Sequence, residues 1–326
     1  MSPLGMAIGT LFVLWIGLHL KKSRPDGDLV EGVHPYRRLM AYIMPTRSES
    51  TVFLDGYVDA GPLLSYLEKA RNGFGADMTH CLVAASAMCM AHTPQVNRFV
   101  VGRRLYQRRG VWVTFSMKRK ALDRAAKLAT VKLELRPGET FRDLCARINQ
   151  QIDTERSGRR TYADKEFDLL GALPRPLLRA GVRLTRVLDY FNLLPASFIE
   201  NDPLYTSMFV ANLGSLGMDP GYHHLYEWGT CPSFMMAGRM EERPIVVDGK
   251  VVVRTVLPLR FTYDERVDDG LSARHAIEVL TGTLARPFEY LGCVEEDGSD
   301  AIPLDRPPSE RCEATSEASA VSAAAR

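Results

Sequence analysis

An uncharged apolar segment at the start of the chain constrains its fold more than any other feature. Residues 3–20 read PLGMAIGTLFVLWIGLHL and contain no Asp, Glu, Lys or Arg, and Lys21, Lys22 and Arg24 follow directly. A helix needs about 17–25 mostly apolar residues to cross the hydrocarbon of a bilayer, so this segment is at the short end of that range. The sequence therefore predicts a membrane anchor helix over residues 1–22, followed by the globular part of the chain.

The basic residues after the apolar segment predict its orientation. Because Lys and Arg gather on the cytoplasmic side of membrane helices, we expect a single-pass protein with its main domain in the cytoplasm. Three alternatives stay open: an interfacial helix that contacts membrane lipid without spanning, a signal peptide, and a buried helix of the globular domain. The signal peptide is disfavoured because no positive charge precedes the apolar run and no small-residue cleavage site follows it.

The composition of the whole chain is that of a folded protein. Of 326 residues, 46% are hydrophobic and 25% are charged, which allows a sizeable core. The formal net charge is only +2 and the basic residues are spread along the chain, so we expect no nucleic acid partner. The six cysteines form no C-x-x-C pair and no Cys/His cluster, which argues against a disulfide framework and against a structural metal site.

Alternating helix and strand patterns predict a mixed α/β (α+β) domain over residues 35–293. Residues 23–34 are polar with Pro and Gly and are expected to form a linker, and the small polar residues 294–326 are expected to form a disordered tail. The segment IVVDGKVVV predicts a hairpin with Asp248 and Gly249 at its turn. The patterns predict helices at 37–44, 60–72, 78–91, 140–153 and 272–284, and strands at 51–58, 98–105, 110–117, 129–135, 207–212, 234–238, 244–247, 250–256 and 257–263.

Residues 155–200 are expected to be helical and amphipathic. Leucine and valine recur at helical spacing among Arg175, Arg179, Arg183 and Arg186. Such a helix either packs on the domain with solvated arginines or lies on an anionic membrane surface. We favour the packed helix at this point, although an N-terminal anchor would bring a membrane within reach.

A motif around residue 265 carries a family resemblance. The segment LPLRFTYDERVDDGLSARHAIEVL runs from a predicted strand into a predicted helix. It resembles the D-H-R-x-x-D-G signature of dihydrolipoyl acyltransferases, the core subunits of the 2-oxoacid dehydrogenase complexes, and chloramphenicol acetyltransferase carries a related motif. In this resemblance Glu265 stands at the position of the catalytic histidine. The matching residues are Asp264, Arg266, Asp269 and Gly270.

Other segments resemble the same family in the same order along the chain. Asn212 and Gly214 match the family segment T-I-S-N-L-G, and Ala211 falls on the small hydroxyl residue that in the family helps to bind the oxyanion. The opening helix at 37–44, the first strand around 57–59 and the turn at 93–97 also resemble family segments.

The resemblance implies a chloramphenicol-acetyltransferase-like mixed sheet flanked by helices, and a homotrimer or higher cubic assembly with active sites between subunits. It implies CoA or lipoyl thioesters as substrates and no tightly bound cofactor. In the family the histidine takes a proton from the attacking thiol or hydroxyl while the hydroxyl residue stabilises the oxyanion. A carboxylate is a weaker base than an imidazole by about two pKa units, and alanine cannot donate a hydrogen bond. Acyl transfer is therefore expected to be altered or lost, and the alternative is a non-catalytic trimeric scaffold at the membrane.

Two further expectations concern individual side chains. His223 and His224 lie in GYHHLYEWGT, where one of them could act as a relocated base oriented by Glu227, whereas adjacent histidines are more often structural. The resemblance also implies that Asp269 pairs with an arginine of the opening helix, Arg37 or Arg38. The alternative for Asp269 is an ordinary turn aspartate before Gly270.

Overall fold

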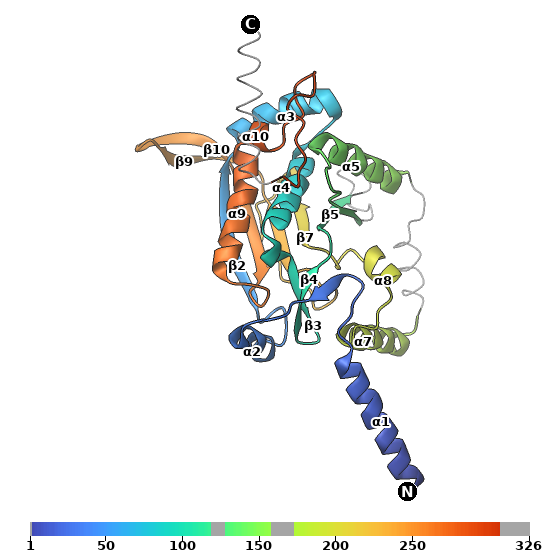
Figure 1. Ribbon diagram of the computed structural model, residues 1–326. Helices are drawn as coiled ribbons and strands as arrows, with labels where there is room; N and C mark the ends of the chain where they lie inside the picture. The colour runs from blue at the N-terminus through green and yellow to red at the C-terminus, as the bar shows by residue number, and fades with distance from the viewer. Residues whose placement is uncertain (1, 119–127, 158–172, 307–326) are drawn as a thin grey trace.

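The computed structural model describes residues 2–118, 128–157 and 173–306 (Figure 1). The helices are α1 (Pro3–Leu20), α2 (Pro35–Ile43), α3 (Gly61–Phe74), α4 (Met78–His92), α5 (Phe141–Arg156), α7 (Arg175–Tyr190), α8 (Ala196–Asn201), α9 (Gly270–Ala285) and α10 (Pro287–Tyr290). The strands are β1 (Gly27–Leu29), β2 (Thr51–Asp59), β3 (Arg98–Val101), β4 (Arg104–Arg108), β5 (Trp112–Lys118), β6 (Leu128–Glu134), β7 (Met208–Asn212), β8 (Ser233–Ala237), β9 (Glu241–Val247) and β10 (Lys250–Asp264).

A mixed sheet forms the centre of the domain. Its strand order is β2-β10-β8-β7-β5-β6, and β9 pairs with the first half of β10. Strands β5, β7 and β8 run parallel, and the other pairs are antiparallel. A separate three-stranded sheet has the order β1-β4-β3. The expected mixed sheet flanked by helices is confirmed.

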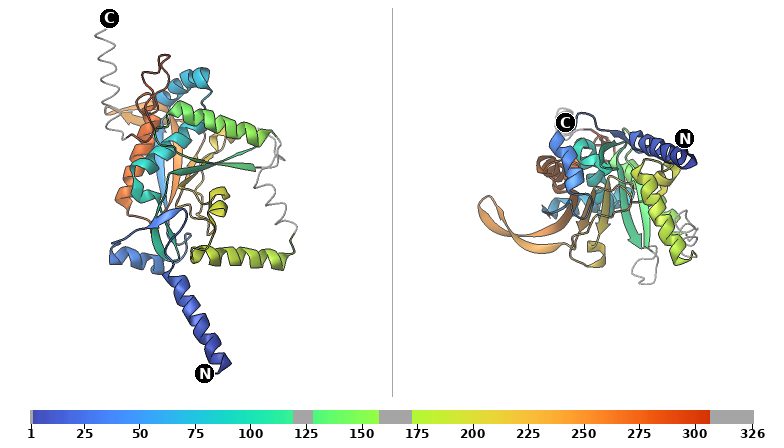
Figure 2. Two further views of the ribbon diagram at one scale, coloured as in Figure 1. Left: turned by 45° about the vertical axis from the view of Figure 1, so that its right-hand side comes forward. Right: turned by 90° about the horizontal axis from the view of Figure 1, so that it is seen from below.

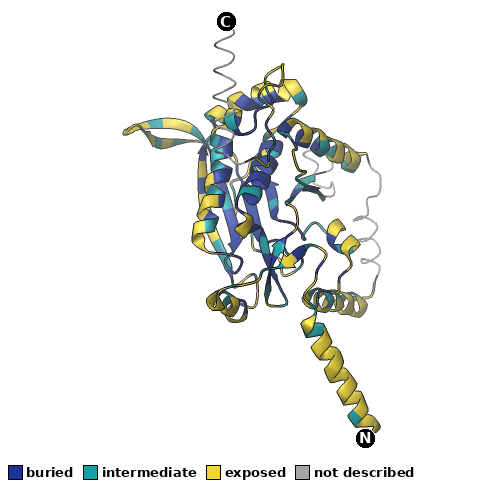
Figure 3. Cartoon of the chain, in the orientation of Figure 1, coloured by how far each residue is buried: buried dark blue, intermediate teal, exposed yellow. Residues whose placement is uncertain are grey.

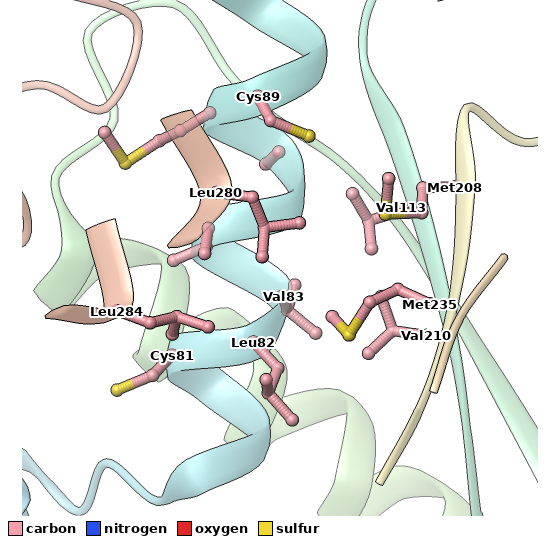
Figure 4. Close-up of a cluster of buried hydrophobic side chains, with 14 of the residues drawn as sticks. Cys81, Leu82, Val83, Cys89, Val113, Met208, Val210, Met235, Leu280 and Leu284 are labelled. Carbon is pink, nitrogen blue, oxygen red and sulfur yellow. The ribbon is translucent and has the colours of Figure 1, made fainter. Parts of the chain in front are cut away.

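Helices α4 and α9 cover one face of the large sheet. Eleven of the fifteen residues of α4 are buried, as its largely apolar sequence requires, and its side chains meet those of α9 and of the sheet strands (Figure 4). Leu259, Phe261 and Tyr263 of β10 point into this core. Because side chains alternate along a strand, Arg260 and Thr262 point to the opposite face. One face of β10 therefore packs in the core against α4 and α9, and the other face points away from these helices.

Two predicted strand boundaries were wrong, and backbone geometry explains both. The expected strand at 98–105 is a tight hairpin, because Gly102 and Arg103 both adopt positive φ and reverse the chain between β3 and β4. The two expected strands at 250–263 form one continuous strand, β10. The turn at Asp248 and Gly249 is confirmed by their φ values of 51° and 74°. Its hairpin projects beyond the body of the sheet (Figure 1).

The segments on either side of the expected domain pack onto it. Within the expected linker, β1 pairs with β4 and Arg24 is buried in ion pairs with Asp26 and Asp189. Within the expected tail, Leu304 is fully buried and its N–H donates to the carbonyl oxygen of Glu139 at 2.8 Å. The rest of the expected tail, 307–326, lies outside the described residues.

Helix α1 extends away from the domain (Figures 1 and 2). None of its residues is buried, so it is not the core helix that was one alternative. It is long and apolar enough to span a membrane. Its C-terminal end touches the domain, where the His19 ring lies 5.1 Å from the Phe191 ring and Arg104 donates to the carbonyl oxygen of Lys21 at 2.8 Å.

Candidate active site

Glu265 lies in the turn between β10 and α9. Its backbone N–H donates to the Ser50 carbonyl at 3.1 Å, and its own carbonyl accepts from the Arg37 guanidinium at 3.1 Å. The half-buried Glu265 side chain lines a hollow of about 400 Å³ between β2, β10 and α9, which we call the α9 hollow. Its residues are Val52, Leu54, Asp55, Tyr263, Glu265, Gly270, Ala273, Arg274, Ile277 and Glu278.

Tyr263 lines the same hollow as Glu265 and was missed by sequence reasoning. It is only 6% exposed, and within the described part of the chain its hydroxyl has no hydrogen-bond partner. Burial raises the pKa of Tyr263, and the nearby carboxylates of Asp268 and Asp264 raise it further. The phenol is therefore protonated at neutral pH and has a hydrogen bond to give. A tyrosine in an apolar strand carries no sequence signal that distinguishes this role from packing.

A buried ion pair fixes the backbone immediately before Glu265. Asp264 and Arg266 are joined by two short contacts of 2.9 and 2.8 Å, and both side chains are almost fully buried. The Ser50 hydroxyl donates to Asp264 at 2.9 Å, and Arg266 also donates to the Met44 carbonyl at 3.1 Å. These bonds tie the start of α9 to the segment between α2 and β2, so both motif residues have structural roles here.

The expected pairing of Asp269 with Arg37 or Arg38 is not what the structure shows. Arg37 contacts the preceding residue, Asp268, at 3.6 Å, while Arg38 is exposed. Asp269 instead caps α9, since its Oδ1 accepts from the N–H groups of Leu271 and Ser272 at 3.1 and 3.2 Å. Because Gly270 begins the helix, the carboxylate one residue earlier is placed at the N-cap position.

This difference predicts the effect of two substitutions. Asp269→Ala should lower the free energy of unfolding by about 1 kcal/mol because two helix N–H groups lose their acceptor. Asp269→Asn keeps a capping oxygen and should lower the free energy of unfolding by only a few tenths of a kcal/mol. Urea unfolding of both variants measures the difference, and an equal loss in both would instead indicate that the negative charge of Asp269 matters.

The residues of the matched segment at 211–214 have packing roles as well. The Asn212 side chain donates to the Thr79 hydroxyl at 3.2 Å and accepts from the N–H of Ser215 at 3.1 Å. Gly214 lies against the backbone of Gly238, where an added Cβ would be only 2.4 Å from the carbonyl oxygen. These contacts give both Asn212 and Gly214 a structural role.

Ala211 and Glu265 lie far apart within one chain. Ala211 pairs with Met236, and Met236 pairs with Arg260, five residues before Glu265. With about 3.3 Å per residue along a strand and about 4.8 Å between strands, the two positions are roughly 20 Å apart. A site that used both positions would therefore need a second copy of the chain.

His223 and His224 are arranged for stacking. The His223 ring stacks on Phe234 with centroids 4.5 Å apart, and its Nδ1 lies 2.6 Å from the His224 carbonyl oxygen. Desolvation lowers the pKa of His223, which keeps its ring neutral. Glu227 does not orient either ring: it accepts from the N–H and hydroxyl of Ser48 at 3.0 and 3.3 Å. In the ranges that the structure describes, no group of three or more potential metal ligands occurs.

Comparison with known sequences places a family match over this region. Residues 203–291 match the family model of the acyltransferase catalytic domain of 2-oxoacid dehydrogenases, and this range includes Ala211, Glu265 and α9. The chain resembles the 2-oxoacid dehydrogenase acyltransferases. It is 45% identical over 49 residues to the lipoamide acyltransferase component of the branched-chain alpha-keto acid dehydrogenase complex of Pseudomonas putida, and 43% identical over 49 residues to that of Pseudomonas aeruginosa. These matches cover 15% of this chain and only 12% and 11% of the relatives.

Solved structures extend the likeness in fold to most of the chain. A probable dihydrolipoamide acetyltransferase from Listeria monocytogenes aligns with a TM-score of 0.52 and 15% identity over 79% of this chain and 94% of that one. The cubic core of a pyruvate dehydrogenase multienzyme complex aligns with a TM-score of 0.52 and 16% identity over 78% of this chain and 87% of that one. A dihydrolipoamide acetyltransferase of Azotobacter vinelandii aligns with a TM-score of 0.51 and 17% identity over 77% of this chain and 90% of that one. That enzyme was studied for the catalytic roles of a serine, a histidine and an asparagine. The acyltransferase fold is thus shared well beyond the matched segment.

Proposed function

We propose that this protein is an acyltransferase acting on acyl thioesters of CoA or of a lipoyl group, with Glu265 as its base. The observation that carries the proposal is that Glu265 and Tyr263 line one hollow, and that the buried Tyr263 hydroxyl has no hydrogen-bond partner in the described part of the chain. The family motif adds support, because the histidine and asparagine studied in the Azotobacter enzyme are four residues apart, as are Glu265 and Asp269. In this proposal Glu265 takes the role of the histidine.

The two side chains divide the chemistry between them. The Glu265 carboxylate accepts the proton of the attacking thiol or hydroxyl as that group forms a bond to the thioester carbonyl carbon. The protonated Tyr263 hydroxyl donates a hydrogen bond to the oxygen on which negative charge develops. When the carbon–sulfur bond to the donor breaks, the proton held by Glu265 passes to the leaving thiolate. The apolar wall formed by Val52, Leu54 and Ile277 limits competing attack by water.

We further propose that the chain assembles as a homotrimer or a larger cubic particle. The hairpin of β9 and β10 projects from the body, and Val246, Val251 and Val253 on it are 67–73% exposed. A two-stranded hairpin with exposed apolar side chains gains stability from a neighbouring copy. The separation of Ala211 from Glu265 also favours a site between copies, and one structural neighbour is a cubic core.

Helix α1 is proposed to anchor this assembly in a membrane. It has a mean hydropathy of 1.7, no buried residue and three basic residues within the next four positions. The positive-inside rule then places the domain in the cytoplasm, where acyl-CoA is available. A reporter fused at the C-terminus should accordingly be inaccessible from outside intact cells.

The catalytic proposal is tested by acyl transfer from acetyl-CoA to dihydrolipoamide with the purified full chain in detergent. Glu265→Gln should lower the rate at least about a hundredfold because the glutamine amide cannot take a proton. Glu265→His should retain or raise the rate, and Tyr263→Phe should lower it about a hundredfold through loss of one oxyanion donor. Unchanged activity in Glu265→Gln would place the base elsewhere.

A non-catalytic scaffold is the second candidate, and a specific observation favours it. Asp264, Arg266 and Asp269 are all engaged in structural bonds, so the motif could persist for folding alone. In that case the unmodified protein would assemble but transfer no acyl group, and the double change Glu265→His with Ala211→Ser would be required for activity.

A further inference from the structure

Several basic and apolar elements share the end of the domain from which α1 leaves. Helices α2 and α7 and the turn between β3 and β4 lie there, around the top of α1 (Figures 1 and 2). We call this surface the basal face. Both helices are largely exposed (Figure 3), although each carries apolar as well as basic residues. The proposed function leaves this surface without a role.

Helix α7 carries an apolar stripe that the domain leaves uncovered. Leu177, Leu184 and Val187 are 57%, 59% and 51% exposed, and their spacing of seven and three residues places them on one side of the helix. The domain packs against the last turn of the same side, where Leu188, four residues after Leu184, lies against Leu194 and Ile199. Arg175, Arg179, Arg183 and Arg186 are all exposed, and their spacing places them together on the other side of the helix. An apolar side with an arginine-rich polar side is typical of helices that lie in a membrane interface.

Helix α2 repeats this pattern on the other side of α1. Tyr36, Leu39 and Ile43 are 61%, 53% and 57% exposed. The Arg103 guanidinium lies 4.8 Å from the ring of Tyr42, which brings the turn between β3 and β4 against this helix. The apolar surface of the basal face is therefore shared by two separate elements.

A basic hollow opens between α2 and the small sheet. It measures about 470 Å³, and its charged lining residues are Lys22, Arg37, Arg38, Arg103, Arg104 and Arg266, with no Asp or Glu among the lining residues that the structure describes. Arg37 and Arg266 contact Asp268 and Asp264, respectively, and Arg104 donates to the carbonyl oxygens of His19 and Lys21 at the end of α1. Lys22, Arg38 and Arg103 are exposed. Such a hollow suits a phosphate group.

The position of α1 decides which partner fits this face. Lys22 follows α1 by two residues, and His19 and Lys21 of the same segment contact Phe191 and Arg104 of the domain. A bilayer that holds α1 therefore comes up against α2, α7 and the basic hollow. The apolar interior of a lipid bilayer can cover the exposed apolar side chains of both helices, and its anionic phosphates can pair with the arginines.

We propose that the basal face docks on an anionic membrane leaflet, with α7 lying in the interface and the headgroup of an anionic phospholipid in the basic hollow. This inference rests on the anchoring of α1 proposed above. Docking would hold the domain against the leaflet in a fixed orientation. The segment between α1 and the domain is consistent with this, because β1 pairs with β4 and Arg24 is buried in ion pairs, so the segment is not a free linker.

The test places a fluorescent label on α7 of the full chain. Leu184→Cys, combined with Cys312→Ser, is labelled with an environment-sensitive dye, since the other five cysteines are buried. The protein is reconstituted into phosphatidylcholine vesicles with or without phosphatidylglycerol, and quenching by a shallow doxyl lipid is measured. We expect strong quenching with phosphatidylglycerol, and several-fold less for the same dye at Ser65→Cys, an exposed position on α3 at the opposite end (Figure 1).

A matched pair of variants tests the basic hollow. Lys22→Gln with Arg38→Gln and Arg103→Gln should remove most of the phosphatidylglycerol-dependent quenching. The same loss of three charges by Arg239→Gln, Arg254→Gln and Arg274→Gln, all exposed on other surfaces, should not change it. If the two triple variants reduced the quenching equally, general charge attraction would explain the dependence on phosphatidylglycerol, and the headgroup site would be overturned.

Flotation of the vesicles separates the failure of this inference from that of the anchor. If the chain floats with the vesicles but the dye at position 184 is quenched by aqueous iodide as readily as the dye at position 65, docking is wrong and the anchor stands. If the dye is shielded from both iodide and doxyl lipid, a second protein copy covers α7, and the lipid inference is overturned. If the chain does not float, both proposals fail.

Discussion

Asp264→Ala is expected to lower the free energy of unfolding by about 3–5 kcal/mol. The substitution leaves the Arg266 guanidinium buried without its carboxylate, and an uncompensated buried charge is among the most costly defects in a protein interior. The side chains of the pair are only 1% and 4% exposed, so water cannot replace the lost partner. The Ser50 hydroxyl loses its acceptor as well. Urea unfolding of the detergent-solubilised chain, followed by circular dichroism, measures the change.

Two controls show whether the cost comes from the unpaired charge. Removing both partners, by Asp264→Leu with Arg266→Met, should recover much of the loss because no charge stays buried. Asp219→Ala breaks an ion pair with Arg239 whose side chains are 66% and 55% exposed, and should cost less than about 1 kcal/mol. A loss in the double variant as large as in Asp264→Ala would contradict the explanation.

Phe141→Ala is expected to destabilise the domain by about 3–5 kcal/mol through a cavity between α3 and α5. Phe141 is fully buried, and its ring lies 6.1 Å from that of Tyr66 and 5.7 Å from that of Phe74, centroid to centroid. The alanine would lose both aromatic contacts and the apolar area of the ring. The same urea titration should show a lower midpoint with little change in slope.

Size and burial can be separated for this position. Phe141→Leu keeps most of the apolar volume and should cost less than about 2 kcal/mol. Leu64→Ala on α3 removes an apolar side chain that is 41% exposed and should cost less than Phe141→Ala by several-fold. If Leu64→Ala were as harmful as Phe141→Ala, burial between α3 and α5 would not be the cause.

The elements with strong local signals were predicted well. The helices α3, α4 and α9, the strands β2 and β6 and the turn at Asp248 and Gly249 all lie within a few residues of their expected positions. Each has either a helical or strand periodicity of its own, or turn residues that accept positive φ. Besides the strand boundaries at 98–105 and 250–263, the segments missed are those whose signal is short: β1 has three residues, and after Val294 the buried apolar residues are Ile302 and Leu304.

For the site, the sequence by itself determined which residues fall in the segments that resemble the family. From that resemblance we expect Glu265 at the position of the histidine and Ala211 at that of the hydroxyl residue, and this remains a prediction. The sequence also determined that the first twenty residues can form a membrane helix, since length and hydropathy decide this without a fold.

Only the tertiary structure decided what surrounds those residues. Side-chain partners depend on the strand register and the packing of α9 on the sheet. This packing forms the hollow that Tyr263 and Glu265 share, pairs Arg37 with Asp268 and leaves Asp269 as a helix cap. The same packing separates Ala211 from Glu265 by several residues along the sheet. The apolar side of α7 could not be assigned from its periodicity, because an amphipathic helix has the same sequence pattern whether that side packs on a core or on a bilayer. The fold leaves most of that side exposed next to α1.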